Sequence, residues 1–394
     1  MTTLAAPLPR LAAVTRPIDD VVDLLEARGA DGFVWLRDGA GLVTAGVAAR
    51  VPVGDVDAAL ASIETDDPLG WSGTGPIAVG ALPFDRAAHG ELVIPSVVLG
   101  RRADGRCWVT EVGDRPARLH VSEDPTTPSS WTVTAGTNAA AWHAMVDTAL
   151  GAIDRGEVTK VVLAREVVVE TDVAPSVTGV LAHLRAHQPD CFLYQADGLV
   201  GATPELLVRR AGPRIESCPF AGTVPAGDGA AARLRASAKD AWEHRLVVDD
   251  VVSTLDPVCE TLAVPAEASV TSLASVVHLA TPVHGTLREP APSALTLARA
   301  LHPTAAVAGT PRDAALRLLT ELEPVPRGRY AGPVGWVDAR GDGEWAVALR
   351  GAQLDGCRAI LHAGAGIVQG SQPDAEWDET QAKLEPMLGA LIRP

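Results

Sequence analysis

The sequence has little positive charge. Its 394 residues include 33 lysines and arginines against 49 aspartates and glutamates, which gives a formal net charge of −16. A chain of this sign offers no broad basic surface to nucleic acid or to an anionic membrane. We therefore expect neither as a partner, and a small anionic substrate would need a local group of cationic side chains.

Cysteine and long apolar runs are also scarce. The five cysteines form no CxxC pair, and the ten histidines show no metal-ligand spacing with them. This argues against a disulfide framework and against zinc, and it favours a reducing compartment, which we take to be the cytoplasm. No run approaches the 18 apolar residues of a membrane helix, and the first twenty residues lack the apolar segment of a secretory signal.

The sequence is rich in apolar residues and turn formers. Hydrophobic residues make up 47% of the chain, with 37 glycines and 30 prolines, whereas only 21% of residues are charged. This composition suits one large folded core or two medium domains, and it argues against disorder.

Strand and helix signals occur in blocks. Residues 1–135 are β-rich, with hairpin patterns over 32–51 and 97–112. Residues 136–394 mix both types, and we expect the two portions to form one compact unit joined by a connection over 123–137. Because strands and helices do not alternate strictly, the pattern predicts an α+β fold with mainly antiparallel sheets. Helices are expected over 140–157, 237–260, 292–304, 313–324 and about 373–391, a strand over 158–170, two strands around residues 197–198, and three strands over 331–368.

Two acidic pairs share one spacing. Glu376 and Glu379 lie three residues apart in AEWDETQAK, and Asp240 and Glu243 repeat that spacing in KDAWEH. On a helix such residues share a face, which is usually solvated, and Lys383 is placed to pair with Glu379. Alternatively, two such helices would hold a hard cation such as Mg²⁺ between their carboxylates.

Two ionisable residues stand in apolar segments. Lys160 lies in the strand pattern VTKVVLAR. There it either guards an edge strand or extends its amine to solvent, or it acts as a base whose pKa is lowered by apolar surroundings. Glu205 follows a proline in GATPELLVRR. It is a turn residue or a partner for Arg209 or Arg210, or else a buried carboxyl that acts as a general acid.

Candidate anion-binding groups come from three other segments. The turn HAGAGIV offers the backbone N–H groups of Gly364, Ala365 and Gly366, because its glycines lack bulk. Arg350 ends the segment EWAVALR and would clamp a carboxylate, although arginines at strand ends are usually solvated. Gly222 and Thr223 belong to CPFAGTVPAG, which is turn-like by itself.

Taken in order, the motifs resemble those of the chorismate-utilising enzymes. That family includes isochorismate synthases, salicylate synthases and the large subunits of anthranilate and aminodeoxychorismate synthases. The resemblance covers residues 140–391, with a weaker extension into the N-terminal third. The motifs are VTKVVLARE, ATPELLV, FAGT, KDAWEHRLVVDD, HLATP, ALHPTAAVAGTP, GPVGWVDARGDGEWAVALR, AGAGIV and EWDETQAKLEPML.

The resemblance implies a fold, a metal and a substrate. The fold is one large unit like the anthranilate synthase large subunit, with packed antiparallel sheets, outer helices and a deep cleft. The metal is Mg²⁺, with Glu243 and Glu379 as ligands and Asp240 and Glu376 behind them through water. The resemblance also implies substrate contacts from Gly222, Thr223, His278, Ala306, Val307, Arg350, Gly364, Ala365, Gly366 and Lys383.

The resemblance further implies a reaction. Anthranilate synthases usually carry glutamine where this chain has Lys160, and a lysine there is typical of members that use water. Lys160 would deprotonate water for attack at C2 of chorismate, and Glu205 would protonate the departing C4 hydroxyl, giving isochorismate. The segments HLATP and GEWAVALR are most similar to isochorismate synthases.

Other functions remain compatible with the sequence. A salicylate synthase, which goes on to eliminate pyruvate, is the main alternative, and a non-catalytic ligand-binding member is a further one. Ala226 stands where an arginine is frequent, and Val307 stands where isochorismate synthases often have leucine, which would leave room for partial pyruvate loss. We expect a monomer whose product feeds menaquinone synthesis or a catechol or salicylate siderophore.

Overall fold

The β-branched runs of the sequence form the largest sheet. The computed structural model describes residues 11–19, 23–29, 32–114, 126–273 and 275–393. Thirteen of its strands belong to this sheet. They are β1 (Ala12–Ile18), β2 (Val34–Arg37), β3 (Ala40–Ala45), β5 (Glu64–Asp66), β8 (Val97–Arg101), β9 (Cys107–Val112), β10 (Trp131–Ala135), β11 (Lys160–Thr171), β12 (Phe192–Ala196), β13 (Leu199–Thr203), β21 (Gly309–Thr310), β24 (Gly351–Asp355) and β25 (Arg358–Ile367).

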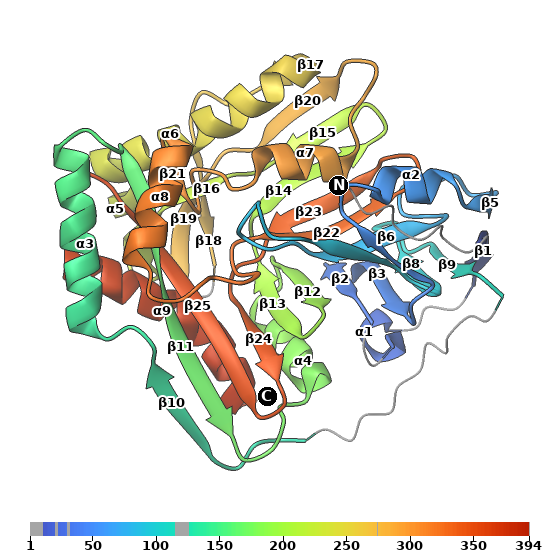
Figure 1. Ribbon diagram of the computed structural model, residues 1–394, viewed down its shortest axis with the longest axis horizontal. Helices are drawn as coiled ribbons and strands as arrows, with labels where there is room; N and C mark the ends of the chain where they lie inside the picture. The colour runs from blue at the N-terminus through green and yellow to red at the C-terminus, as the bar shows by residue number, and fades with distance from the viewer. Residues whose placement is uncertain (1–10, 20–22, 30–31, 115–125, 274, 394) are drawn as a thin grey trace, which may run out of the picture.

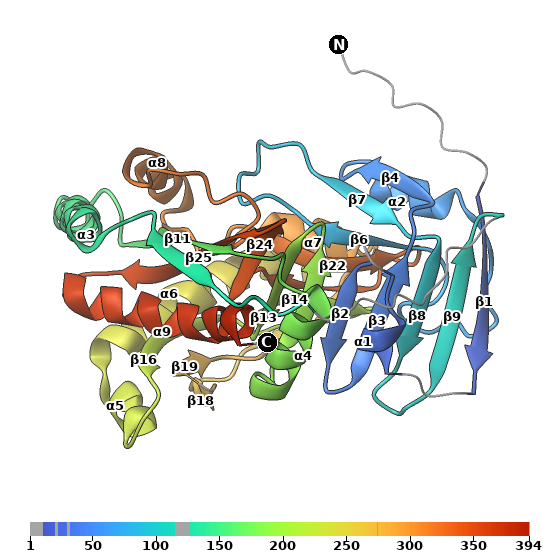
Figure 2. The ribbon, with the colours of Figure 1, turned by 90° about the horizontal axis from the view of Figure 1, so that it is seen from below.

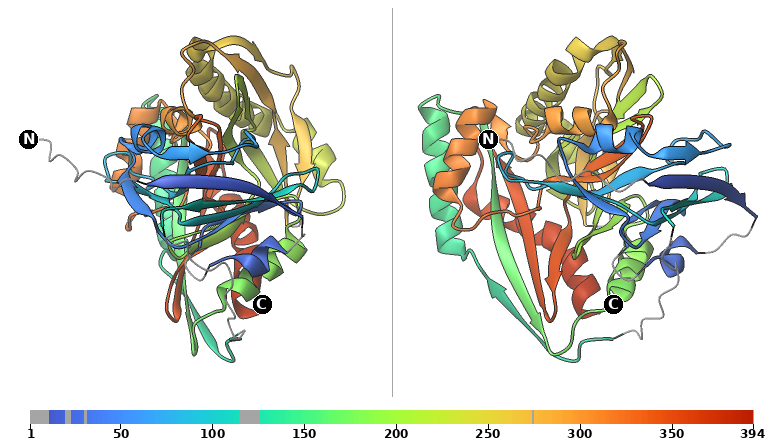
Figure 3. Two further views of the ribbon diagram at one scale, coloured as in Figure 1. Left: turned by 90° about the vertical axis from the view of Figure 1, so that its right-hand side faces the viewer. Right: turned by 45° about the vertical axis from the view of Figure 1, so that its right-hand side comes forward.

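This sheet runs through both portions of the chain. Its order is β10-β11-β25-β24-β13-β12-β2-β3-β8-β9-β1-β5, and β21 pairs with the start of β11. The N-terminal strand β2 pairs with β12, so hydrogen bonds cross between residues 1–135 and the rest. Figures 2 and 3 show the N-terminal strands side by side at one end of the molecule, and α3 with its neighbouring helices at the other.

A second, nine-stranded sheet packs against the first. Trp35 and Phe192 of the large sheet share a core cluster with Val79 and Trp336 of the second. Neighbouring strands of this second sheet are antiparallel throughout. In their order across the sheet, the strands are β17 (Cys259–Ala263), β20 (Val283–Leu287), β15 (Arg214–Ser217), β14 (Leu206–Ala211), β23 (Gly343–Val347), β22 (Pro333–Asp338), β6 (Ile77–Ala81), β7 (Glu91–Ile94) and β4 (Ala49–Pro52).

A small third sheet and the helices complete the fold. The sheet has the order β16 (Phe220–Pro225), β19 (Val276–Ala280), β18 (Ser269–Ser272). Within the described residues, no helix is long and apolar enough to cross a membrane. The helices are α1 (Leu24–Ala27), α2 (Val56–Ala61), α3 (Ala139–Asp154), α4 (Val177–His187), α5 (Ala230–Ala236), α6 (Ala238–Leu255), the 3-10 turn η1 (Asp256–Val258), α7 (Ala294–Leu301), α8 (Arg312–Leu322) and α9 (Pro373–Ile392).

Most expected elements are present, and three expectations are wrong. Residues 131–135 form strand β10 rather than part of a connection, because their backbone pairs with β11. The segment 331–368 contains four strands, since Gly356 at positive φ allows a tight turn between β24 and β25. The helix expected to reach residue 260 ends at Leu255, and Cys259 already belongs to strand β17. The long strands β11 and β25 run next to each other, with α9 close by (Figure 1).

Candidate active site

One cavity collects most of the residues selected from the sequence. Strands β11, β16, β19 and β25 and helices α6 and α9 all contribute side chains or backbone to its wall. The lining residues are Val162, Pro204, Glu205, Phe220, Ala221, Thr223, Glu243, His278, Ala306, Val307, Arg327, Tyr330, Leu349, Arg350, His362, Ala363, Gly364, Gly366, Glu379 and Lys383.

Lys160 lies at the edge of this cavity, at the start of β11. It is 1% exposed, and its Nζ lies 3.0 Å from Oε1 of the lining residue Glu243. A Cβ at Gly366 would lie 2.1 Å from that oxygen and 3.0 Å from Cε of Lys160, so any side chain there would clash with the pair. An edge-strand guard would be solvated, and burial therefore argues against that alternative for Lys160.

Glu205 occupies the bend between β13 and β14. It is 4% exposed, and its backbone carbonyl accepts a hydrogen bond from the N–H of Val347. Burial raises the pKa of its carboxyl to about 7, although the charge of Lys160 works in the opposite direction. Arg209 pairs with Glu216 and Glu344 instead, so the side chain of Glu205 is not used in that surface ion pair.

Arg350, His278 and Thr223 form a chain of hydrogen bonds in the cavity wall. Nη2 of Arg350 donates to Nε2 of His278 at 2.7 Å, which leaves Nδ1 of His278 to donate to Oγ1 of Thr223 at 2.9 Å. Burial and the arginine's charge hold the pKa of His278 well below its usual value, so the imidazole is neutral. Among the described residues, the buried Nη1 of Arg350 has no hydrogen-bond partner. An unpaired guanidinium N–H beside a cavity suits a carboxylate ligand.

Lys383 connects helix α9 to strand β25. Its Nζ donates to the carbonyl of Gly364 at 2.9 Å and to Oε1 of Glu379 at 2.5 Å. The i,i+4 pair expected from the sequence therefore exists, but it faces the cavity instead of bulk water. Lys383 thus places a cationic group beside the glycines of β25.

The two acidic pairs belong to helices α6 and α9, as their spacing predicted. Ser237 caps α6, and its side chain accepts from the N–H of Asp240, so that the first acidic pair lies in the opening turns. Glu243 and Glu379 line the cavity, whereas Glu376 is buried behind it and pairs with Lys239 at 2.8 Å. The pairing Lys239–Glu376 joins the two helices.

The donor set suits a hard divalent cation. All four side chains offer carboxylate oxygens, the ligands that Mg²⁺ prefers. Burial raises the pKa of Glu379 to about 7, and the negative charges of Glu376 and Glu243 add to that effect. Burial and the charge of Glu243 also raise the pKa of Asp240. Lys160, Lys239 and Lys383 partly offset this excess of negative charge. Within the described ranges, no three His, Cys, Asp or Glu groups lie close enough together to hold a metal ion.

Other expected contact residues divide into two groups. Ala306 and Val307 line the cavity from the segment between α7 and α8. Gly222 and Ala365 do not. Gly222 has φ +72°, and its backbone packs against Asp240 of α6. Ala365 lies on the face of β25 opposite to Gly364 and Gly366, in a core cluster with residues of α3 and α8.

Sequence reasoning missed several lining residues. Tyr330 is one of only two tyrosines in the chain, and its hydroxyl lies 3.1 Å from the place a Cβ at Gly364 would take. Its ring stacks on His362, and burial raises its pKa to about 12. Arg327 lies near it in the turn RGRYAG. The only local signal was a buried tyrosine among turn residues, which is too weak to indicate a site.

Residues 99–392 match the sequence profile of a family described as "Chorismate binding enzyme", and the chain therefore belongs to that family. Over 339 residues it is 42% identical to a Mycobacterium tuberculosis protein provisionally named isochorismate synthase, covering 81% of this chain and 87% of that protein. It is 36% identical to isochorismate synthase DhbC of Bacillus subtilis, covering 80% and 81%. The solved Escherichia coli MenF, described as a menaquinone-specific isochorismate synthase, superposes with a TM-score of 0.83 at 26% identity, covering 98% and 95%. The family resemblance and the α+β fold are thereby confirmed.

Proposed function

We propose that this chain is an isochorismate synthase, a hydroxymutase that converts chorismate to isochorismate. Relatives and a solved structure with that name match most of the chain. One observation carries the assignment of roles. The buried amine of Lys160 lies beside the cavity that Glu205 lines, close enough for its charge to lower the pKa of that carboxyl.

The proposed reaction needs a base and an acid on one substrate. Lys160, as a neutral amine, accepts a proton from water as the water oxygen bonds to C2 of chorismate. Glu205, protonated because burial raises its pKa, gives a proton to the C4 hydroxyl, whose bond to carbon breaks as the double bonds shift. One water enters and one leaves, so the product is an isomer of the substrate.

Two groups in the cavity wall bind the two substrate carboxylates. Nη1 of Arg350 is the first, and His278 fixes the orientation of that guanidinium through Nη2. The backbone of Gly364 and Gly366 is the second, since side chains there would meet Tyr330 and Glu243. Thr223, Ala306, Val307 and Lys383 complete the wall.

Mg²⁺ is the cofactor that we propose, held by Glu243 and Glu379 with Asp240 and Glu376 behind them. When bound, the ion supplies positive charge to a ring carboxylate of the substrate. The carboxyl groups orient that end of the cavity, and the raised pKa of Glu379 reflects burial together with the negative charge around it. Isothermal titration with Mg²⁺ alone should give a binding isotherm that Glu379→Gln weakens at least tenfold.

Salicylate synthesis is the second candidate. Val307 lines the cavity with a small side chain, and the space this leaves favours partial pyruvate loss. Salicylate as the main product would establish that alternative. Anthranilate formed from added ammonia would place the chain in another branch of the family.

We also propose a cytoplasmic monomer that acts on a small molecule. All five cysteines are free, which suits a reducing compartment. The product would enter menaquinone or siderophore synthesis. Light scattering after size exclusion should give a mass near 40.8 kDa.

Product identification tests the function. Purified protein with chorismate and Mg²⁺, without ammonia, should yield isochorismate by liquid chromatography and mass spectrometry, and EDTA should stop the reaction. Unchanged chorismate under these conditions, with a folded protein, would overturn the proposal.

A further inference from the structure

Strand β11 has a gap in its pairing along one edge. On that edge β21 pairs with Lys160 and Val161, and β10 pairs only from Val167 onward. The N–H of Val162 still donates to the carbonyl of Ala308 at 2.9 Å, next to β21. Within the described residues, no strand on that edge pairs with the carbonyl of Val162 or the N–H of Ala164, and buried backbone groups need hydrogen bonds.

An arginine and a glutamate fill this gap. The carbonyl of Val162 accepts from Nη2 of Arg327 at 2.6 Å, and the N–H of Ala164 donates to Oε1 of Glu323 at 2.9 Å. Nε and Nη2 of Arg327 also donate to the two carboxylate oxygens of Glu323, so the side chains form a bidentate pair. The pair replaces a short length of strand.

The same guanidinium also reaches the segment just before β21, which borders β11 through the hydrogen bond from the N–H of Val162 to the carbonyl of Ala308. Its Nη1 donates to the carbonyl of Val307 at 2.7 Å, and its plane lies over the ring of Phe84. Val162 and Val307 both line the cavity, and Lys160 lies two residues before Val162 on the same face of β11. Arg327 therefore adds to the backbone hydrogen bonds that fix the spacing between the strand that carries the base and the segment beside it.

Burial of the ion pair between Arg327 and Glu323 costs free energy unless every hydrogen bond of the pair is made. Arg327 is 5% exposed, and burial of an ion pair repays its desolvation only with good geometry and further hydrogen bonds. A lysine in its place keeps the charge but lacks the planar fork that reaches two carbonyls and a carboxylate at once.

We propose that Arg327 is a positioning residue for the reaction, acting with Glu323 to hold Lys160 at the distance that proton transfer requires. The inference rests on the proposed function. Misplacement of a reacting group by about 1 Å can cost on the order of a hundredfold in rate. The loss should appear in kcat more than in KM, because Arg350 and the glycines of β25 remain in place.

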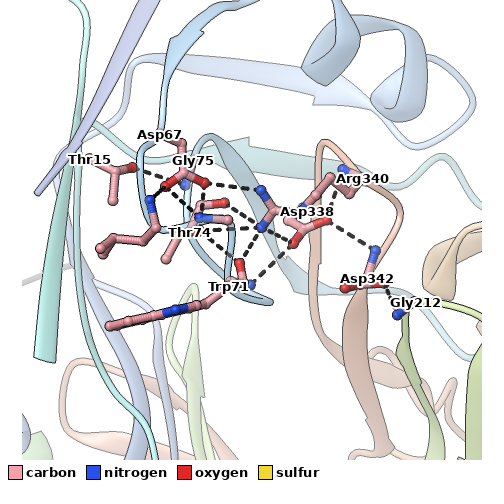
Figure 4. Close-up of polar contacts among 12 residues, drawn as sticks. Thr15, Asp67, Trp71, Thr74, Gly75, Gly212, Asp338, Arg340 and Asp342 are labelled. Carbon is pink, nitrogen blue, oxygen red and sulfur yellow. Dashed lines mark hydrogen bonds and ion pairs between the residues drawn. The ribbon is translucent and has the colours of Figure 1, made fainter. Parts of the chain in front are cut away.

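The matched control is Arg340, in the turn between β22 and β23. It also donates to several acceptors, among them Asp67, Asp338 and the carbonyl of Thr74 (Figure 4), none of which lines the cavity. We expect Arg327→Lys to lower kcat for chorismate consumption at least tenfold with KM within threefold. Arg340→Lys should leave both constants within twofold, per folded molecule by circular dichroism.

A milder variant covers the case in which Arg327→Lys does not fold. Glu323→Gln keeps an oxygen for Ala164 and Arg327 but loses the charge, and it should lower kcat about threefold to tenfold. Active wild-type protein together with wild-type kcat in the folded variants would overturn this inference alone. Wild-type protein that leaves chorismate unchanged would instead overturn the proposed function and this inference with it.

Discussion

Arg340 and Arg350 flank the same strand, β23, and they use their hydrogen-bonding groups differently. Arg340 precedes the strand and donates to Asp67, Asp338 and the carbonyl groups of the loop between them (Figure 4). Arg350 follows the strand, has φ +51°, and donates only to His278 among the described residues, with Nη1 unpaired. Arg340 therefore completes the hydrogen bonding of a loop, whereas Arg350 has an N–H group available to bind a ligand.

The acidic residues near Arg340 and near Arg350 also differ in their hydrogen-bond partners. Burial works to raise the pKa of Asp67, but hydrogen bonds from Thr74 and Arg340 lower it overall. Burial raises the pKa of Asp338 as well, so the direction of a shift does not by itself distinguish the regions. Asp338 accepts from Arg340 and three backbone N–H groups, whereas the carboxyl of Glu205 has a hydrogen bond from the backbone of Phe220 and, among the described residues, none from an arginine or lysine side chain. A directly bonded arginine therefore distinguishes the acid of the structural network from the acid of the site.

The largest effect on activity should follow from Lys160→Ala. A positioned base contributes about 10²- to 10⁴-fold to rate, so kcat for chorismate should fall by that factor. Chromatographic rates at saturating chorismate and Mg²⁺ measure it. The control is Lys239→Ala, which also removes a lysine from a buried carboxylate, that of Glu376. Neither Lys239 nor Glu376 lines the cavity, so kcat should fall less than tenfold. Turnover of Lys160→Ala within threefold of wild type would remove Lys160 from the mechanism.

Arg350→Lys should have the next largest effect. Hydrogen bonds to charged groups contribute about 1.5–3 kcal/mol, so loss of the fork should raise the Kd for chorismate roughly 10- to 100-fold. Titration calorimetry measures it directly, and Arg340→Lys serves as the control on the other side of β23. A Kd within twofold of wild type would mean that the unpaired Nη1 does not bind substrate.

The pH dependence of kcat/KM should report Glu205. The carboxyl must be protonated to act as an acid, and burial raises its pKa to about 7. Above this pH the protonated fraction falls about tenfold per unit, and kcat/KM should fall with it. Glu205→Gln should be slower and should lose this limb of the profile. A limb that persists unchanged in Glu205→Gln would assign it to another group.

Much of the site was predictable because its signals are local. Three-residue spacing placed Asp240 with Glu243 on one helix and Glu376 with Glu379 on another. Strand alternation placed Lys160 on the face of Val162, which lines the cavity. These patterns require only the periodicity of one element, so a single segment of sequence contains them.

The remainder depends on how segments meet. Arg327 and Tyr330 lie in a turn, and their role arises only where that turn meets β11 and the residues before α8. The edge strand β10 was missed because it follows a Pro-, Thr- and Ser-rich segment that resembles a loop, and only β11 supplies its partner. The alternation of β25 turns the side chain of Ala365 into the core, so the contact expected there remains one of its backbone N–H alone.

The smallest effect on turnover should come from Arg340→Ala, although it should destabilise the fold. The side chain of Asp338 is fully buried, and loss of the hydrogen bond from its charged partner should lower the free energy of unfolding by about 1.5–3 kcal/mol. Urea denaturation should show that decrease, while kcat per folded molecule stays within twofold because the network of Figure 4 contains no cavity residue. Loss of turnover at full folding would mean that the loop held by Arg340 is coupled to the cavity, and the contrast between the two arginines flanking β23 would no longer separate structure from function.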